Sequence, residues 1–464
     1  MIVRRVLVVT AVMTVLALTG AIGLGADTAA AQPQIGENSC QGADACTGLT
    51  ADVGDNSCNG PMACFNNSGE VGSNSCNGES ACAANSGDVG GGSCNASAAC
   101  GENSGPVGNG SCIGARACGA NTADVGDNSC NADFAACFGN TGSVGKDSCN
   151  GDFNVCRNNS ADIDDGSCNG ALACFNNSVP VGEGSCNGQG ACDGNSGTVA
   201  DGSCNGLFAC RLNSESVKNA SCNGQEACNG NSGPVGSESC NGARACADNS
   251  GALGTGSCNA GVEPGAAESC QLNRGTVADG ACNGGLACLG NAGPISDGSC
   301  VGFLACIRNS GTVGRESCIG LAACQDNSGD VAAGSCNTLG ACSSNRGALG
   351  AGACNGRAAC DHNSGSIGNE SCAGDLACVS NRSAVSQDSC AGSFACAANS
   401  GDVDKRSCNG ERACNGERAS LQNTGSVGKR SCNGEEACRN NSGIIGNKQC
   451  NGVQACKDNT ADIP

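Results

Sequence analysis

The chain has 464 residues, among them 77 Gly, 46 Cys and 8 Phe but neither Trp nor Tyr, and its formal net charge is −20. So few large apolar side chains cannot build a thick layered core, and so negative a charge argues against nucleic-acid binding. Cysteine at about one residue in ten is typical of a disulfide scaffold, whose bonds persist outside the reducing cytoplasm.

The N-terminal segment differs in composition from the rest of the chain. Two arginines precede an apolar run that ends near Gly25, and a small-residue stretch ends at Ala31. This order predicts a secretory signal peptide over residues 1–31, followed by a short lead-in over residues 32–39. The run is also long enough to span a membrane, so an uncleaved anchor is the alternative. We expect a secreted protein, extracellular or at the cell surface, with no membrane contact beyond this segment.

Residues 40–464 form an array of one 18-residue unit, Ser-Cys-Asn-Gly-x-x-Ala-Cys-x-x-Asn-Ser-Gly-x-Val-Gly-x-x, repeated 23 times. A fixed period indicates one elongated repeat domain. Frequent Gly and Asn-Gly turns break any helical pattern, whereas three short extended stretches, around Cys58, Cys64 and Val71, fit the unit. We therefore predict an all-β fold, a single parallel β-solenoid of about 23 coils, right-handed by the usual preference of parallel crossovers.

Each position of the unit has an expected orientation. The Val71 position is aliphatic in every unit and should face the interior. Side chains alternate across a strand, so with the first cysteine inward, the Ser before it and the Asn after it should point outward. The first members of this possible outward ladder are Ser57, Asn59, Ser75 and Asn77. A second asparagine, Asn67 and its equivalents, is expected to form hydrogen-bonded corner ladders between coils.

The cysteines occur in pairs with none left over. The economical interpretation is one disulfide per coil, between the two cysteines of each unit, and bonds between neighbouring coils are the alternative. Five residues intervene in most pairs, whereas zinc ligands are usually separated by two to four, so no metal and no cofactor are expected. Representative structural pairs are Cys40 with Cys46, Cys58 with Cys64, Cys76 with Cys82, Cys130 with Cys137, Cys149 with Cys156, Cys258 with Cys270, Cys408 with Cys414, and Cys450 with Cys456.

Two units contain six additional residues. One contains residues 262–265, and in the other residues 415–420 repeat the sequence of residues 409–414 with serine in place of the second cysteine. Insertions in repeat arrays commonly project from one face and can carry binding. We expect both to be inert loops.

Charged residues lie mostly at the variable positions of the unit. They are expected to form a solvated surface that keeps the rod soluble. Weak calcium binding along acidic ladders is the alternative, and the densest acidic group consists of Asp162, Asp164 and Asp165. Paired structural cysteines are inert and the single histidine, His362, occupies a variable position, so no catalytic residue is assigned.

The spacing of Cys58 and Cys64 resembles the repeat of the beetle antifreeze proteins, Thr-Cys-Thr-x-Ser-x-x-Cys, over the disulfide half of the unit. The resemblance implies a right-handed solenoid with its two cysteines bonded across the coil. In that family the two threonines bind ice, and here Ser57 and Asn59 stand in their places. No characterised family resembles the full array.

The expected function is that of a secreted, non-catalytic rod of structural or surface-interaction type, adhesin-like or matrix-like, with an unidentified extracellular partner. The alternative is an ice- or crystal-surface-binding protein that uses the Ser and Asn ladders. A β-helix enzyme acting on polysaccharide is less favoured, because no unit carries a distinct reactive cluster and Trp and Tyr, which stack on sugars, are missing. Handedness, oligomeric state and partner are not fixed by the sequence.

Overall fold

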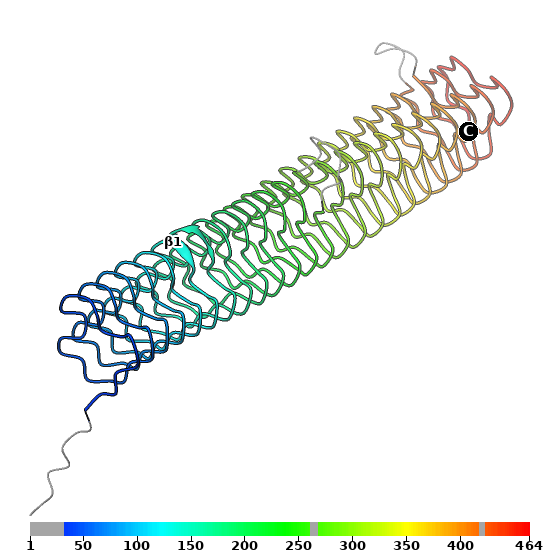
Figure 1. The fold of residues 1–464 in the computed structure, drawn as a ribbon. Coiled ribbons are helices and arrows are strands. Elements are labelled where there is room, and N and C mark those ends of the chain that lie inside the picture. Colours follow the sequence, from blue (N-terminus) through cyan, green and yellow to red (C-terminus); the bar gives the residue numbers. More distant parts are fainter. Residues whose placement is uncertain (1–31, 260–267, 417–422) are drawn as a thin grey trace, which may run out of the picture.

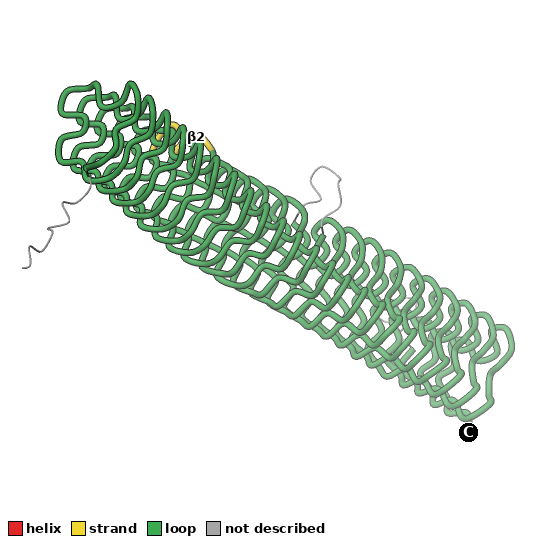
Figure 2. Tube along the Cα trace, turned by 60° about the horizontal axis from the view of Figure 1, so that its bottom comes forward, coloured by secondary structure: helices red, strands yellow, loops and turns green. Residues whose placement is uncertain are grey.

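The computed structural model describes residues 32–259, 268–416 and 423–464. The expected signal peptide and most of the two six-residue insertions lie outside these ranges. Within them the fold is repetitive and non-helical, and the strands are two short parallel ones, β1 (Ala132–Phe134) and β2 (Gly151–Phe153). Figures 1 and 2 show the units stacked in one elongated body. The described residues contain no helix with the length and apolar character needed to span a membrane.

One parallel bridge per unit holds the stack in register. Val53 pairs with Val71, Val71 pairs with Val89, and the series continues to Ile463. From Val53 to Ile445 these side chains are buried, Val71 being 4% exposed, which confirms the inward orientation expected for this position. The series begins at Ile35, which pairs with Val53. The expected lead-in is therefore already part of the stack.

The rest of the unit consists of turns, and the expectation of three extended stretches per unit is wrong. The amides of Ala63, Phe65 and Asn67 each donate to the carbonyl three residues earlier, at 3.2 Å in all three cases. The first cysteine, Cys58, has a φ of 58° and Met62 one of 53°, values in the left-handed region that an extended strand excludes. In the part of the chain that the structure describes, regular strand pairing is confined to β1 and β2, which lie in the two units with an extra residue between their cysteines.

A ladder of buried asparagines runs along the interior, as expected for the Asn67 position. Nδ2 of Asn85 donates to Oδ1 of Asn67 at 2.7 Å and to the carbonyl of Gly87 at 2.6 Å. The side chains are 0% exposed, so each amide is satisfied by the adjacent unit instead of by water. Oδ1 of Asn423, just after the second insertion, is the one ladder oxygen without a partner among the described residues.

We expect Asn213→Ala to destabilise its part of the stack by about 1–3 kcal/mol, the usual cost of a buried polar group left unpaired. The change removes the inter-unit partner of Asn195 Oδ1 and the donor to the Glu215 carbonyl. Native-state hydrogen exchange measures such local opening. Asn219→Ala, at an exposed position of the same unit, is the control, with an expected change under about 0.5 kcal/mol. Equal loss of protection in both variants would contradict a stabilising ladder.

Candidate functional site

The interior is lined by a continuous series of disulfides. All 46 cysteines are paired, each with the other cysteine of its own unit, at sequence separations of 6, 7 or 12. The Cα–Cα distances run from 5.5 to 5.8 Å, within the range of ordinary disulfides. The alternative of bonds between neighbouring units is therefore wrong. The eight representative pairs are all present.

The disulfides also determine what the cysteines can do chemically. Sulfur atoms from neighbouring units approach one another, and those of Cys94, Cys100 and Cys112 lie within 4.8 Å of one another. Metal ions and electrophiles react with thiolates, and a sulfur in a disulfide carries none. The sulfur clusters of the described interior therefore offer neither zinc ligands nor nucleophiles.

The prediction that the serines of the outward ladder point to the solvent is wrong. Ser57 and Ser75 are 0% exposed. Alternation across a strand requires an extended backbone, and the left-handed φ of Cys58 turns the chain so that the serine before it also faces inward. The hydroxyl of Ser57 donates to the carbonyl of Gly72 at 2.8 Å and accepts from the amide of Ser75 at 3.1 Å. These serines therefore hold units together and present nothing to a partner.

The asparagine half of that ladder lies at the surface, half-buried. Oδ1 of Asn77 accepts from the amide of Asn59 at 3.1 Å, and Nδ2 of Asn59 donates to the carbonyl of Asn38 at 2.9 Å. Both polar atoms of each side chain are thus engaged in joining units. The surface available for recognition consists mainly of the variable positions of the turns.

Many surface carboxylates cap backbone amides of the preceding unit. Oδ1 of Asp55 accepts from the amide of Glu37 at 2.7 Å. Asp162 accepts from both the hydroxyl of Ser143, at 2.6 Å, and its amide, at 3.0 Å, and these bonds hold the pKa of Asp162 below its ordinary value. Of the acidic group considered for calcium, Asp162 and Asp165 act as such caps, the latter toward the amide of Lys146. The acidic surface is therefore partly structural.

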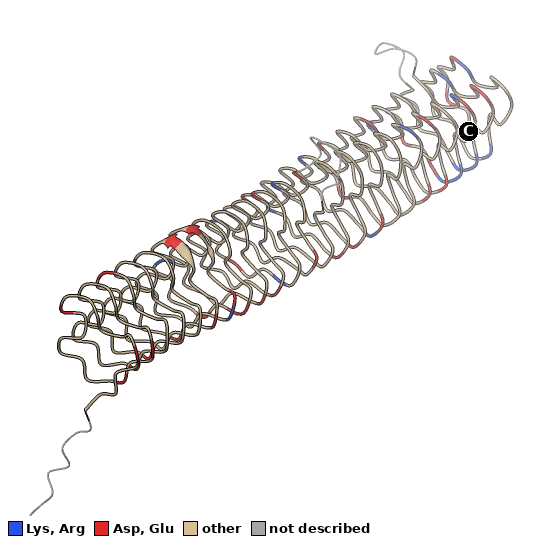
Figure 3. Cartoon of the chain, in the orientation of Figure 1, with Lys and Arg blue, Asp and Glu red and all other residues tan. Residues whose placement is uncertain are grey.

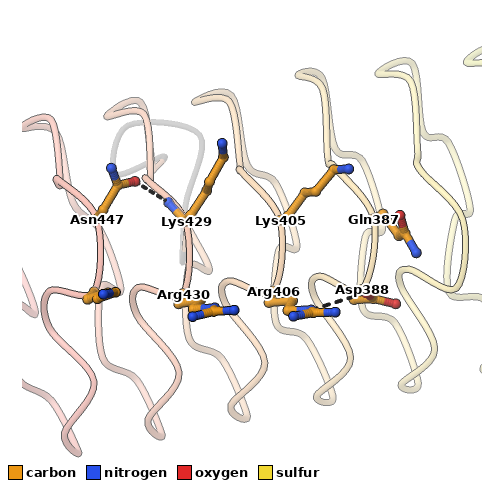
Figure 4. Close-up of a pocket in the computed structure, with 8 residues that line it drawn as sticks. Gln387, Asp388, Lys405, Arg406, Lys429, Arg430 and Asn447 are labelled. Atoms are coloured by element: carbon orange, nitrogen blue, oxygen red, sulfur yellow. Dashed lines mark hydrogen bonds and ion pairs between the residues drawn. The ribbon is translucent and has the colours of Figure 1, made fainter.

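One edge of the last units has the opposite charge. Five exposed cations occupy the same two turn positions on three consecutive units and, with neighbouring residues, line a hollow of 430 Å³ (Figure 4). We call this surface the basic edge, and its members are Lys405, Arg406, Lys429, Arg430 and Lys448. Among the described residues, one of the five has an ion-pair partner: Nε of Arg406 lies 3.5 Å from Asp388 Oδ2. The other four cations of the edge form no ion pair with the described residues.

The basic edge was not predicted from the sequence, although the sequence contains a signal for it. The dipeptides Lys405-Arg406 and Lys429-Arg430 both begin two residues after the aliphatic bridge residue of their units. Stacking at a fixed period places such equivalent residues side by side. Comparison of the variable positions unit by unit would have detected the row, whereas the net charge of the whole chain conceals it.

The chain belongs to the family described as Domain of unknown function (DUF7640), whose pattern matches six overlapping stretches, residues 10–99, 64–173, 154–264, 263–351, 335–413 and 407–464. The family match therefore extends over nearly the whole chain and repeats along it. No curated protein and no solved structure matches this chain.

We expect the double variant Cys222→Ala/Cys228→Ala to lower the local unfolding free energy by about 2 kcal/mol, the entropy effect of opening a loop of this size. Hydrogen exchange around residues 222–228 measures the change. Thiol labelling of the unreduced wild-type chain in denaturant tests the pairing itself, and we expect no labelled cysteine. A substantial free-thiol fraction, or peptides linking different units, would contradict the pairing.

The region of Asp162 should lose stability in acid. Because the folded chain lowers the pKa of Asp162, its contribution is complete above the unfolded pKa, near 4, and is lost as pH falls through the folded value. Carboxyl titration by NMR should give an Asp162 pKa that rises toward the ordinary value in Ser143→Ala, because the substitution removes the hydroxyl donor and leaves only the amide donor. An unchanged pKa in that variant would show that the hydroxyl is not the cause.

Proposed function

We propose that this protein is a secreted, non-catalytic rod of structural or surface-interaction type, folded as a parallel β-solenoid of about 23 coils. The observation that carries the proposal is the unbroken interior series of intra-unit disulfides, with no free thiol among the described residues. Such a scaffold forms and persists in an oxidising, extracellular setting. The apolar N-terminal run that ends before Ala31 supports export.

The solenoid assignment is supported by the parallel register of the units. Bridges and side-chain hydrogen bonds join residues one unit apart along the array, as between Val53 and Val71 and between Asn67 and Asn85. Right-handed coiling is part of the proposal and rests on the general preference of parallel crossovers. Each unit contacts its neighbours and has no core of its own, so stability should accumulate along the rod.

A non-catalytic role is supported by the uniformity of the units. The polar groups of the repeated Asn and Ser positions are used in joining units. His362 is exposed, and its ring nitrogen Nδ1 lies 2.9 Å from Asp361 Oδ1. Specific recognition of a partner is then left to the variable positions, whose residues differ from unit to unit. The class of partner that these positions suit is a protein or glycan bound over several units.

The ice-binding alternative gains no support from the positions of the ladder residues. It requires a regular outward array of polar side chains, and the serines at Ser57 and Ser75 are buried. Asn59 and Asn77 remain at the surface but are half-buried and hydrogen-bonded to the backbone. An assay for thermal hysteresis with the intact protein is the direct test, and we expect none.

We expect the full chain, expressed with its N-terminal segment in a secreting host, to appear in the medium with an N-terminus near Gln32. It should resist proteases until reductant and denaturant are added together, because the disulfides are buried. Mass spectrometry of the medium and of the cell fraction measures both properties. Retention in the cytoplasm with reduced cysteines would refute the proposed role. Hydrolysis of a polysaccharide by the purified rod would refute the non-catalytic assignment.

A further inference from the structure

Charge is unevenly distributed along the rod. Residues 32–145 contain eleven acidic side chains and one basic, a formal charge of −10, whereas residues 405–464 contain nine basic and six acidic, a charge of +3. Figure 3 shows Lys and Arg gathered on the last units, near the end marked C. The two ends of the described stack are therefore complementary in charge, although the whole chain is acidic.

A second surface hollow lies near the N-terminal end. Its exposed charged residues are acidic, whereas those of the basic edge are basic. We call it the acidic groove. It has a volume of 580 Å³, lies along the first units, and its exposed acidic residues are Asp52, Asp55, Glu70 and Asp88. Oδ1 of each aspartate accepts a hydrogen bond from a backbone amide of the preceding unit. The second oxygen of each carboxylate is left to accept a hydrogen bond from an incoming cation.

The two surfaces have the same spacing. Asp52, Glu70 and Asp88 each precede the bridge residue of their unit by one position, so the groove has one acidic side chain per unit at an equivalent position. Lys405 and Lys429 each follow the bridge residue of their unit by two positions, so the basic edge likewise has one cation per unit at an equivalent position. Consecutive units repeat at one rise, about 4.8 Å for parallel pairing. When two rods lie side by side over a short overlap, rows of opposite charge with equal spacing can align so that each charge of one row lies opposite a charge of the other.

We infer that the basic edge of one copy docks on the acidic groove of a second copy, so that rods join head to tail. The contact uses two different surfaces of the same chain, and such a heterologous contact does not close unless rotation brings the ends together. The product is an open filament of overlapping rods. A linear polyanion would satisfy the basic edge alone, whereas a second copy also accounts for the acidic groove at the other end. This inference goes beyond the proposed secreted role and does not depend on it.

The charges on the basic edge are positioned for an external partner. Asp402 and Asp404 precede Lys405 in sequence, but the described residues show no ion pair between them and that lysine. Oδ1 of Asp402 instead accepts from the amide of Ala384 at 3.2 Å. Lys405 and Lys429 extend away from the backbone on the same side in Figure 4.

Long-range repulsion between the acidic rods does not prevent this contact at moderate salt. Exposed charges separated by more than about 10 Å are largely screened at ~0.1 M salt. The charges that matter are then those in the overlap, where opposite signs face each other. Higher salt screens these exposed pairs as well, so assembly should weaken as salt increases.

The test is sedimentation velocity of the full secreted chain at several protein concentrations in ~0.1 M salt. We expect the weight-average sedimentation coefficient of the wild type to rise with concentration and the rise to shrink in high salt. Lys405→Glu/Lys429→Glu should weaken the association by about tenfold or more. The matched control is Lys146→Glu/Lys218→Glu, which changes the net charge equally at exposed lysines that line neither surface and should leave association unchanged.

A charge swap distinguishes docking from loss of folding. Glu37→Lys/Glu70→Lys reverses two exposed acids near the groove whose side chains make no hydrogen bond to the described residues. It should also abolish self-association, and mixing it with Lys405→Glu/Lys429→Glu should restore assembly. Three results would overturn the inference: a monomeric wild type at every concentration, equal effects of basic-edge and control variants, or no rescue on mixing. Heparin binding through the basic edge without self-association would assign the edge to a polyanion instead.

Discussion

Hydrogen bonding between residues one unit apart is the constraint on which the whole structure depends. The side-chain amide of Asn85 donates a hydrogen bond to Oδ1 of Asn67, and the backbone amide of Ser75 donates one to the hydroxyl of Ser57. No water competes for these buried groups, so a unit displaced by one residue would leave several ladders unpaired at once. The two longer units that contain β1 and β2 keep the ladders because their extra residue lies between the cysteines.

Disulfides and small residues form the half of the interior that lies around the cysteines, and the aliphatic bridge residues form the rest of the core. Ala63 and Cys64 are both 0% exposed, and nearly every unit has a small residue at the Ala63 position, Val155 being an exception. The turns bring an opposing cost, because non-glycine residues such as Cys58 and Met62 adopt left-handed backbone conformations at about 1–2 kcal/mol each. Cross-links that restrict the unfolded chain, together with ladders that stabilise the folded one, offset this cost in every unit.

The sequence was sufficient for those features that follow from the period. The buried Val71 position and the Asn67 ladder depend on spacing and on residue type. For the cysteines the spacing favoured pairing within units but left bonds between neighbouring units open, and the structure decided between them. The orientation of Ser57 could not be predicted, because it depends on the φ of Cys58, and cysteine has no marked preference for the left-handed region. The basic edge was missed for a different reason. Each unit contributes only one or two cations to the basic edge, so the row of cations forms only when the units stack.

The amide caps show that charge at the surface can vary without altering the interior. Near the N-terminal end the amide of Glu37 donates to the carboxylate of Asp55, whereas on the basic edge the amide of Lys429 donates to the neutral side chain of Asn447 at 2.8 Å. The cap requires an acceptor oxygen and not a negative charge. The acidity of the first units therefore exceeds what folding requires, as does the basic row of the last units. Both are surface properties carried by an otherwise uniform rod, and charge differences of this kind determine which partner a surface can approach.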